Sequence, residues 1–529
     1  MYSYYGRNLY YKRWQDYYPE SVAVEASDVR TIAQLSQYNI RGLVYSLERF
    51  AFSKTIPDQI FLNAWQDTAI TKIGDFSVGN LASSLYPFSK FGINPREDFL
   101  NVWQNTAITK IEDFSAENLA SSLYILIVMF GIVPKADFLD VWQDTAITKI
   151  GDFSTRNLSD SIEAFSITPR EDFLDAWQDR ALSQIAYFNS HELVNSIQSF
   201  SKLKVVPKAD FLDAWQDVAI TKVDFTPYAL GVSVHSFSKL SIIPRAGFLN
   251  AWQNDAVNKI GDFSTDDLIY SIQSFSKLKV VPRADFLDAW QDIAITKVDF
   301  TPYALGVSVH SFSKLSIIPR AGFLNAWQND AVNKIGDFST DDLIYSIQSF
   351  SNFGIVPRGD FLDAWQNIIM TKIEVLSAAE LVSSIQSFSN FGIVPRGDFL
   401  DAWQNIIMTK IEVLSAAELV SSIQSFSNFG IVPRGDFLDA WQNITITKIE
   451  GLSSHELVNS IQSFSNFGIV PREDFLDAWQ NTARTKEDFH EEYDVDYLIA
   501  LFSTLGIETR DGFLEVAVLG YTSKHGCEE

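Results

Sequence analysis

Apolar side chains recur along this chain with the period of an α-helix. Leu381, Ile385 and Phe388 follow the i, i+4, i+7 spacing that places side chains on one face of a helix. Ser377 precedes them and Gly392 follows them, as expected for a serine cap and a glycine stop. This pattern predicts a helix with one buried face, called helix A below.

A second helical segment, helix B, follows in the same unit. Phe399, Trp403 and Ile407 recur every four residues, which places them on one stripe. Pro395 is expected to be the first residue of helix B, because the N–H group that proline lacks would be unpaired there. The connectors on both sides are short, so helices A and B are predicted to form an antiparallel hairpin.

These two helices are repeated along the chain. The text Pro-x-x-x-Phe-Leu-x-x-Trp-Gln marks each helix B, and its tryptophans are 37 or 38 residues apart, with single intervals of 39 and 35. Such self-similarity indicates a repeat array. The expected fold is all-α, a right-handed-type α-solenoid of about 12 or 13 tandem antiparallel hairpins. The tryptophans stand at positions 65, 103, 142, 177, 215, 252, 290, 327, 365, 403, 441 and 479.

Some repeats are copies of one another. Residues 209–276 recur as 284–351 with a single Val-to-Ile difference, and residues 358–395 recur unchanged as 396–433. The array has therefore grown by duplication. Whatever these copies do must be repeatable along a rod, which favours modular binding over one catalytic pocket.

The two ends differ from the middle and are interpreted as caps, because terminal repeats need a polar outer face. The N-terminal cap is predicted over residues 1–56, a Tyr-rich lead with a capping helix. The tandem repeats are predicted over residues 57–483, and a degenerate repeat with a C-terminal cap over residues 484–529.

Composition narrows the partners and the compartment. The chain has 66 acidic and 41 basic side chains, a formal net charge of −25, which opposes indiscriminate binding of polyanions. Its one cysteine, Cys527, excludes an intrachain disulfide and fits a reducing compartment. The N-terminus has no apolar signal core, and the most apolar stretch, residues 119–134, is too short to span a membrane. A soluble intracellular, cytoplasmic protein without membrane contact is expected.

Candidate catalytic and metal-binding groups are sparse. The six histidines have no cysteine or second histidine at metal-ligand spacing, and the sequence has no HExxH, phosphate-loop or Gly-x-Ser-x-Gly text. We expect no enzyme, no cofactor, no metal and no small-molecule substrate. The recurrent tryptophan has two interpretations, a stacking platform for bases or a core residue between repeats, and its place on the apolar stripe favours the core.

Polar side chains that vary on helix A while the core stays fixed are the candidate binding residues. Each helix A has a core leucine, which is Leu381 in the unit described above. The second, fifth and ninth residues after this leucine lie on one face, called the helix A stripe. They are mostly Gln, Asn, His, Tyr and Lys, with Val232 and Val307 at two second positions and acids, Asp160 and Glu163, in the shortened unit. The candidates are Ser83, Tyr86, Lys90, Asn195, Gln198, Lys202, His235, Lys239, Tyr270, Gln273, Lys277, His310, Lys314, Tyr345, Gln348, Asn352, Ser383, Gln386, Asn390, Ser421, Gln424, Asn428, Asn459, Gln462 and Asn466.

Three interpretations of this stripe remain open. Its side chains can hydrogen-bond or stack on bases, and one-base-per-repeat RNA readers use two or three side chains per helical repeat. A groove for a peptide or protein is a second interpretation, and a merely solvated helix face is a third. Because most acids fall on helix B and at helix starts, the negative charge would face away from a groove lined by helix A.

The units resemble those of the octotricopeptide repeat family. Residues 395–399, Pro-Arg-Gly-Asp-Phe, and their copy at 357–361 correspond to that family's proline-proline-proline-glutamate-tryptophan signature, keeping the first proline, the acid and an aromatic. The resemblance covers about residues 57–517. It implies an RNA-binding α-solenoid of a kind known from green-algal organelles, with relatives in intracellular bacteria. Delivery into an organelle or a host cell is implied by the resemblance only.

Two functions follow as expectations. The first is modular binding of single-stranded RNA along helix A, about one base per repeat. The alternative is a protein-protein interaction scaffold, such as a bacterial effector that binds a host or cellular protein, which the net charge of −25 and the absence of arginine from the stripe favour. A monomer is expected for either function.

Overall fold

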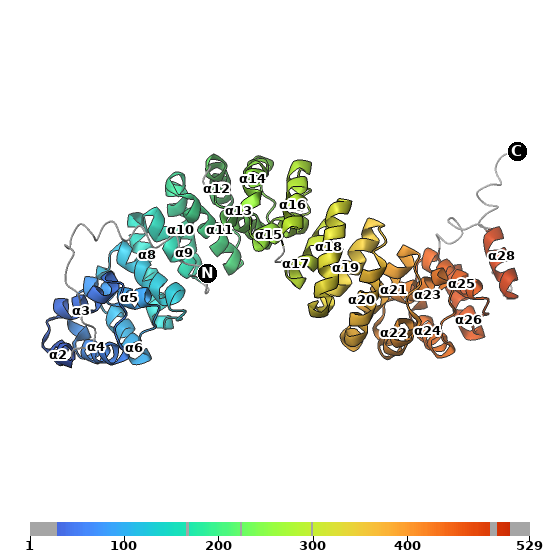
Figure 1. Ribbon diagram of the computed structural model, residues 1–529, viewed down its shortest axis with the longest axis horizontal. Helices are drawn as coiled ribbons and strands as arrows, with labels where there is room; N and C mark the ends of the chain where they lie inside the picture. The colour runs from blue at the N-terminus through green and yellow to red at the C-terminus, as the bar shows by residue number, and fades with distance from the viewer. Residues whose placement is uncertain (1–28, 166–168, 223–224, 298–299, 487–494, 508–529) are drawn as a thin grey trace. The chain divides into compact units, whose positions relative to one another are not determined.

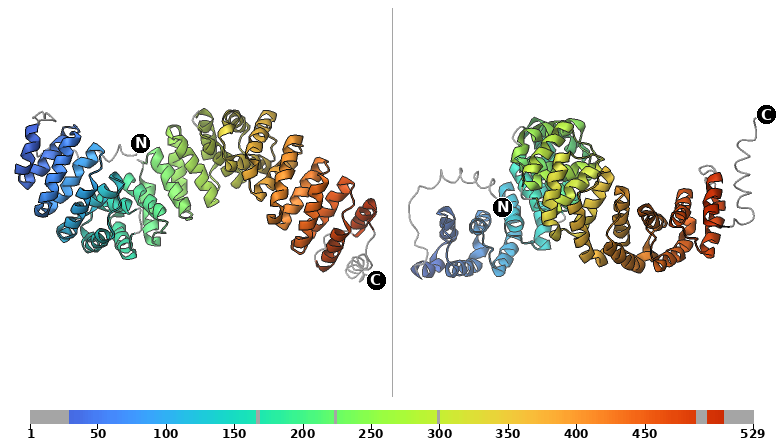
Figure 2. Two further views of the ribbon diagram at one scale, coloured as in Figure 1. Left: turned by 90° about the horizontal axis from the view of Figure 1, so that it is seen from below. Right: turned by 45° about the vertical axis from the view of Figure 1, so that its right-hand side comes forward.

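Stacked helical hairpins form the described part of the chain, and the predicted all-α solenoid fold is confirmed (Figure 1). The computed structural model describes residues 29–165, 169–222, 225–297, 300–486 and 495–507. The chain divides into two compact units, called unit 1 and unit 2. Unit 1 comprises Met1–Phe225 and Pro244–Leu249, and unit 2 comprises Thr226–Ile243 and Asn250–Glu529. Within each unit, neighbouring hairpins lie side by side (Figure 2).

The hairpins alternate an odd-numbered helix A with an even-numbered helix B. A short helix, α2 (Val29–Gln34), precedes them. The A helices are α3 (Ile40–Phe52), α5 (Val78–Phe91), α7 (Ala116–Tyr124), α9 (Thr155–Ala164), α11 (Ser190–Leu203), α13 (Pro227–Lys239), α15 (Thr265–Leu278), α17 (Pro302–Lys314), α19 (Thr340–Phe353), α21 (Ala378–Phe391), α23 (Ala416–Phe429) and α25 (Ser454–Phe467), followed at the end by α28 (Val495–Leu505). The B helices are α4 (Gln59–Lys72), α6 (Glu97–Ile108), α8 (Ala136–Lys149), α10 (Glu171–Gln184), α12 (Ala209–Thr221), α14 (Ala246–Lys259), α16 (Ala284–Thr296), α18 (Ala321–Lys334), α20 (Gly359–Lys372), α22 (Gly397–Lys410), α24 (Gly435–Lys448) and α26 (Glu473–Thr485).

Short helical turns connect many of these elements. Most B helices continue into one turn of 3-10 helix, and α7 continues into a π-helical turn, η4 (Ile125–Met129). The 3-10 turns are η1 (Leu35–Gln37), η2 (Ile73–Asp75), η3 (Ile111–Asp113), η5 (Ile150–Asp152), η6 (Ile185–Tyr187), η7 (Ile260–Asp262), η8 (Ile335–Asp337), η9 (Ile373–Val375), η10 (Ile411–Val413) and η11 (Ile449–Gly451).

Helix A starts and stops where the sequence signals stand. The side chain of Ser377 accepts a hydrogen bond from the backbone N–H of Glu380, and the Glu380 carboxylate accepts one from the backbone N–H of Ser377 at 2.7 Å. Gly392 ends α21 in the left-handed conformation, with φ of +66°, a region that glycine enters without steric cost. Both predicted signals are confirmed.

The prediction that Pro395 is the first residue of helix B was wrong. The helix begins two residues later, at Gly397, and Arg396 is its N-cap with an extended backbone. Arg396 takes this position because its backbone N–H donates to the side-chain oxygen of Gln366 in the preceding repeat, at 2.8 Å. Pro395 is buried in the connector, where a residue without an N–H group leaves no donor unpaired.

The tryptophan of each helix B is buried in the core. Trp403 is 0% exposed, and its indole N–H donates to the carbonyl of Leu381 in helix A of the same hairpin, at 2.7 Å. Its ring also packs against Phe426 and Phe437 of the next repeat, with ring centroids 5.6 and 5.8 Å apart. All twelve repeat tryptophans are buried and make this bond to a helix A leucine. The core interpretation is confirmed, and a stacking platform for bases is excluded.

The glutamine after each tryptophan joins consecutive hairpins. Gln404 is 4% exposed; its side-chain oxygen accepts a hydrogen bond from the backbone N–H of Arg434 in the next repeat, at 2.8 Å. Its amide nitrogen donates to the carbonyl of Leu400 in its own helix, at 3.3 Å. The Gln404 side chain therefore pairs with the backbone N–H of the N-cap residue of the following helix B. That N–H group has no partner within its own helix.

Helices A pack against one another more closely than helices B. The closest pairs are α13 with α15 and α17 with α19, where Gly231 and Gly306 face Asp267 and Asp342. In other repeats a buried serine such as Ser384, 0% exposed, permits the approach. In a stack of hairpins the more closely packed layer is on the inner side of the local curvature. Helix A therefore lines the inner side within each unit.

Parts of both predicted caps, together with Cys527, lie outside the described residues. The boundaries assigned to the caps stay a prediction. Within the described part of the chain, no helix is both long enough and apolar enough to cross a membrane.

Candidate nucleic-acid interface

The helix A stripe grades from exposed to buried along each helix. The lysines and asparagines at the ninth position are exposed, and most fifth-position side chains are half-buried. The second-position side chains are half-buried or buried, and Asn195 is only 7% exposed. The gradient arises because the second position packs against the preceding helix A. A ligand on the inner side would meet the ninth and fifth positions first.

The fifth residue of one helix A meets the second residue of the next. The rings of His310 and Tyr345 are stacked, with centroids 4.0 Å apart and an interplanar angle of 23°. His235 and Tyr270 form the same stack, with centroids 4.4 Å apart at 23°. A contact of this kind belongs to two repeats, and we call the two positions together a composite site.

The histidines of these stacks are neutral near pH 7. Burial, together with the nearby charges of Lys239 and Lys277, lowers the pKa of His235 to about 4. Burial also lowers the pKa of His310. A neutral imidazole has one donor and one acceptor nitrogen, which suits an uncharged base better than a phosphate. The Nδ1 atom of His235 is buried and has no hydrogen-bond partner among the described residues.

Two stripe glutamines, Gln273 and Gln462, have an exposed tyrosine beside them. The side-chain amide of Gln273 donates to the hydroxyl of Tyr303, at 3.2 Å, and Tyr303 is 56% exposed. At Gln462 the direction is reversed, and the hydroxyl of Tyr497 donates to the side-chain oxygen of the glutamine. Sequence reasoning missed these tyrosines, which stand before the reference leucine, in the first turn of the next helix A. Exposed rings next to amides add stacking surface to the stripe.

The ninth position changes character along the chain. It is lysine in five repeats, ending with Lys314, and asparagine from Asn352 onward. Each of these asparagines donates to a serine of the preceding helix A, as Asn390 does to Ser351 at 2.9 Å. The other pairs are Asn352 with Ser313, Asn428 with Ser389 and Asn466 with Ser427. These bonds align the asparagines in a row, which the recurring Ser-Asn text could have indicated.

Unit 1 has carboxylates within its stripe. Burial raises the pKa of Asp160 to about 6, although Arg156 lies 3.4 Å away, and burial also raises the pKa of Glu163. Asn195 donates to Glu163 at 3.0 Å, so these two residues form another composite site. Glu48, whose pKa burial raises, is a third acid that sequence reasoning missed, although counting five residues from Leu43 would have found it.

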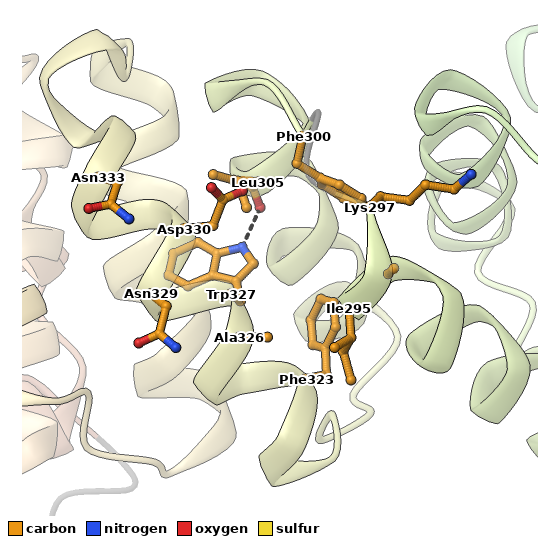
Figure 3. Close-up of a pocket in the computed structure, with 11 residues that line it drawn as sticks. Ile295, Lys297, Phe300, Leu305, Phe323, Ala326, Trp327, Asn329, Asp330 and Asn333 are labelled. Atoms are coloured by element: carbon orange, nitrogen blue, oxygen red, sulfur yellow. Dashed lines mark hydrogen bonds between the residues drawn. The ribbon is translucent and has the colours of Figure 1, made fainter.

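A cavity lies away from the stripe. It has a volume of about 300 Å³, is found in unit 2 between α16 and α18, and is lined by B-helix residues such as Ile295, Ala326 and Asn329 (Figure 3). Figure 3 shows the indole of Trp327 beside it, bonded to the carbonyl of Leu305. Within the described residues, no three His, Cys, Asp or Glu side chains are grouped to hold a metal ion.

Comparison with known proteins gives one family match. A family model described as RNA-editing substrate-binding complex 6 protein matches residues 20–257, less than half of the 529-residue chain. No curated protein matches the chain. The matched residues include most of unit 1 and its stripe positions from Ser83 to Lys202.

Structural similarity extends over most of the chain at low identity. A homology model of the full-length AP-3 complex in an intermediate open conformation aligns with 94% of this chain and 93% of its own, at 10% identity and a TM-score of 0.37. The pentatricopeptide repeat protein PPR10 from maize aligns with 94% of this chain and 89% of its own, at 10% identity and a TM-score of 0.23. Kap121p bound to Ste12p aligns with 94% of this chain and 56% of its own, at 12% identity and a TM-score of 0.27.

Proposed function

We propose that this chain binds single-stranded RNA along the helix A layer, about one base per repeat, and catalyses no reaction. The observation that carries the proposal is the row of composite sites on the inner side. Each site offers amide, imidazole, hydroxyl or aromatic groups, which are the groups that read and stack on unpaired bases. Their spacing is set by the buried Trp–Leu and Gln–backbone bonds, so the row is held by a rigid core.

The family match supports the same partner. The matching model takes its name from an RNA-editing substrate-binding complex, and it covers unit 1 stripe residues. The octotricopeptide resemblance of the 38-residue units also implies RNA.

Charge predicts where phosphate would be tolerated. Within unit 2, Lys239, Lys277 and Lys314 are exposed at consecutive ninth positions, whereas arginines at the starts of B helices pair with aspartates, as Arg396 does with Asp398. Asp160 and Glu163 oppose phosphate in the shortened repeat. The lysine-bearing repeats of unit 2 are therefore the expected place for phosphate contacts, with moderate salt dependence.

A protein partner is the second candidate, and the net charge of −25 favours it. A basic partner would be attracted to the acidic side chains of helix B, whereas RNA would be repelled by them. On this alternative the chain is an interaction scaffold, and the stripe is a solvated face.

Selection against a random single-stranded RNA pool tests the proposal. Full-length protein should enrich one sequence, and fluorescence anisotropy with the enriched RNA should show saturable binding. Gln386→Ala combined with Gln424→Ala should change the enriched sequence while the circular dichroism spectrum and melting curve are kept. Absence of enrichment would exclude the RNA function and leave the protein partner. An unchanged preference in the double variant would exclude helix A as the reading surface.

A further inference from the structure

Internal duplication places identical composite sites at fixed intervals in unit 2. The stacked pair of His235 and Tyr270 recurs two repeats later as His310 and Tyr345, and both stacks have an interplanar angle of 23°. Burial lowers the pKa of both histidines, and a ninth-position lysine follows each of them in the same helix. The two sites are therefore alike in side chains and ring geometry, although Lys277 beside the first stack is replaced by Asn352 beside the second.

Other composite sites lie between and after these stacks. One glutamine–valine site separates them, and two glutamine–serine sites follow, whose serines, Ser383 and Ser421, are equivalent residues of the two copies of the 38-residue duplication. The five consecutive sites of unit 2 are His235–Tyr270, Gln273–Val307, His310–Tyr345, Gln348–Ser383 and Gln386–Ser421. The His–Tyr type therefore stands first and third in this order, the Gln–Val type second, and the Gln–Ser type fourth and fifth.

Sites of one type select the same base, because the atoms that contact the base are the same. The His–Tyr sites offer a ring face and a neutral imidazole, whereas the glutamine sites offer an amide that both donates and accepts. Valine at the second position, 6% exposed at Val307, gives the middle site an apolar floor that Ser383 does not provide.

We propose that the RNA segment bound by unit 2 has the base pattern x-y-x-z-z over five consecutive nucleotides, in one strand polarity or the other. Here x, y and z are the bases selected by the His–Tyr, Gln–Val and Gln–Ser sites. The pattern rests on the proposed RNA binding with one base per repeat. The expected ligand is therefore a single-stranded RNA in which the same base recurs wherever the same type of composite site recurs in the protein.

Site conversion tests the pattern with side chains that the chain already uses. His310→Gln, Tyr345→Val and Asp341→Tyr together turn the third site into the Gln–Val type, with the tyrosine that Gln273 has in Tyr303, and selection should then yield x-y-y-z-z. His235→Gln with Tyr270→Val and Asp266→Tyr should yield y-y-x-z-z. In titrations with the parent sequence, each conversion should weaken binding by roughly 5- to 150-fold, the usual cost of one mismatched base. An RNA in which the one base that faces the converted site is replaced by the newly selected base should bind the variant with the parent affinity.

The control is Asn405→Ala on helix B, which should select the parent pattern. Melting curves of all variants establish that the fold is retained. An enriched RNA without the x-y-x-z-z identities, or conversions that leave the selected bases unchanged, would overturn the pattern while RNA binding itself stands. No enrichment at all would overturn both the pattern and the RNA function.

Discussion

Gly306 faces Asp342 across the contact between α17 and α19. A Cβ atom on Gly306 would lie 2.6 Å from a carboxylate oxygen of Asp342 and 3.2 Å from its Cα. The second distance involves backbone, which a rotamer change cannot move. Gly306→Ala should therefore force the two helices apart and destabilise unit 2 by about 1–3 kcal/mol, as overpacking does. The midpoint of urea unfolding, followed by circular dichroism, measures the effect.

The matched control for this substitution is Gly397→Ala. A Cβ on Gly397 meets nothing within 4 Å, and the residue opens α22 with an ordinary helical backbone. Alanine there should leave the midpoint unchanged or raise it slightly, because it reduces the freedom of the unfolded chain. Equal midpoints for the two variants would contradict close approach as the reason for Gly306.

The hydrogen bond from Gln404 to the next repeat should contribute more to the free energy of unfolding than the exposed contact of the adjacent Asn405. Gln404→Leu leaves the backbone N–H of Arg434 without its partner, which should cost about 1–3 kcal/mol. Asn405→Ala is the comparison, because Asn405 contacts the exposed guanidinium of the same arginine and should cost less than about 1 kcal/mol. Chemical unfolding of both variants checks the order, and a larger effect at Asn405 would refute it.

Asp160 should make unit 1 less stable as the pH rises. Its pKa is about 6 in the folded chain and 3.8 ordinarily, so the folded state holds the extra proton between these values. Stability should therefore fall as the pH increases from about 4 to about 6 and stay reduced above that. Asp160→Asn should melt higher than the parent at pH 7.5, and the difference should vanish near pH 4. Asp152→Asn, at an exposed neighbouring aspartate, is the matched control, and an equal rise of its melting temperature at pH 7.5 would contradict the assignment to Asp160.

Lysines of the stripe should contribute affinity without sequence preference. Lys277→Gln should weaken binding of the selected RNA at low salt and reduce the slope of log K against log salt by about 0.7, the value for one phosphate contact to a single strand. Lys222→Gln, at the end of helix B, should leave the slope unchanged. Anisotropy titrations between low and moderate salt give both slopes. A change in the selected bases would assign Lys277 to base reading instead.

Much of the fold could be predicted because the same local signals recur in every repeat. Periodic apolar residues gave helices A and B, and the text around Ser377 and Gly392 gave the limits of helix A. The first residue of helix B was wrongly predicted to be Pro395, because the backbone N–H of the N-cap residue Arg396 is held by Gln366, 30 residues earlier. A partner at that distance leaves no trace in the local pattern.

The candidate site was predictable as a set of positions but not as a set of contacts. Counting from the helix A leucine found the stripe, since side-chain direction follows from helical geometry. The stacking of His310 on Tyr345 could not be read from the sequence, because it depends on how closely α17 and α19 approach. That approach depends in turn on a glycine, which hydrophobic periodicity does not mark.

The glutamine bond between hairpins also bears on how such a chain changes over generations. The side-chain oxygen of Gln404 accepts a hydrogen bond from the backbone N–H of Arg434, a group that every residue except proline has. Any hairpin of this type can therefore follow any other without a compensating substitution at the junction. Unequal recombination between near-identical gene segments would add or remove whole hairpins and leave every junction bonded. The number of repeats is thus free to drift, and the length of the recognised ligand would drift with it.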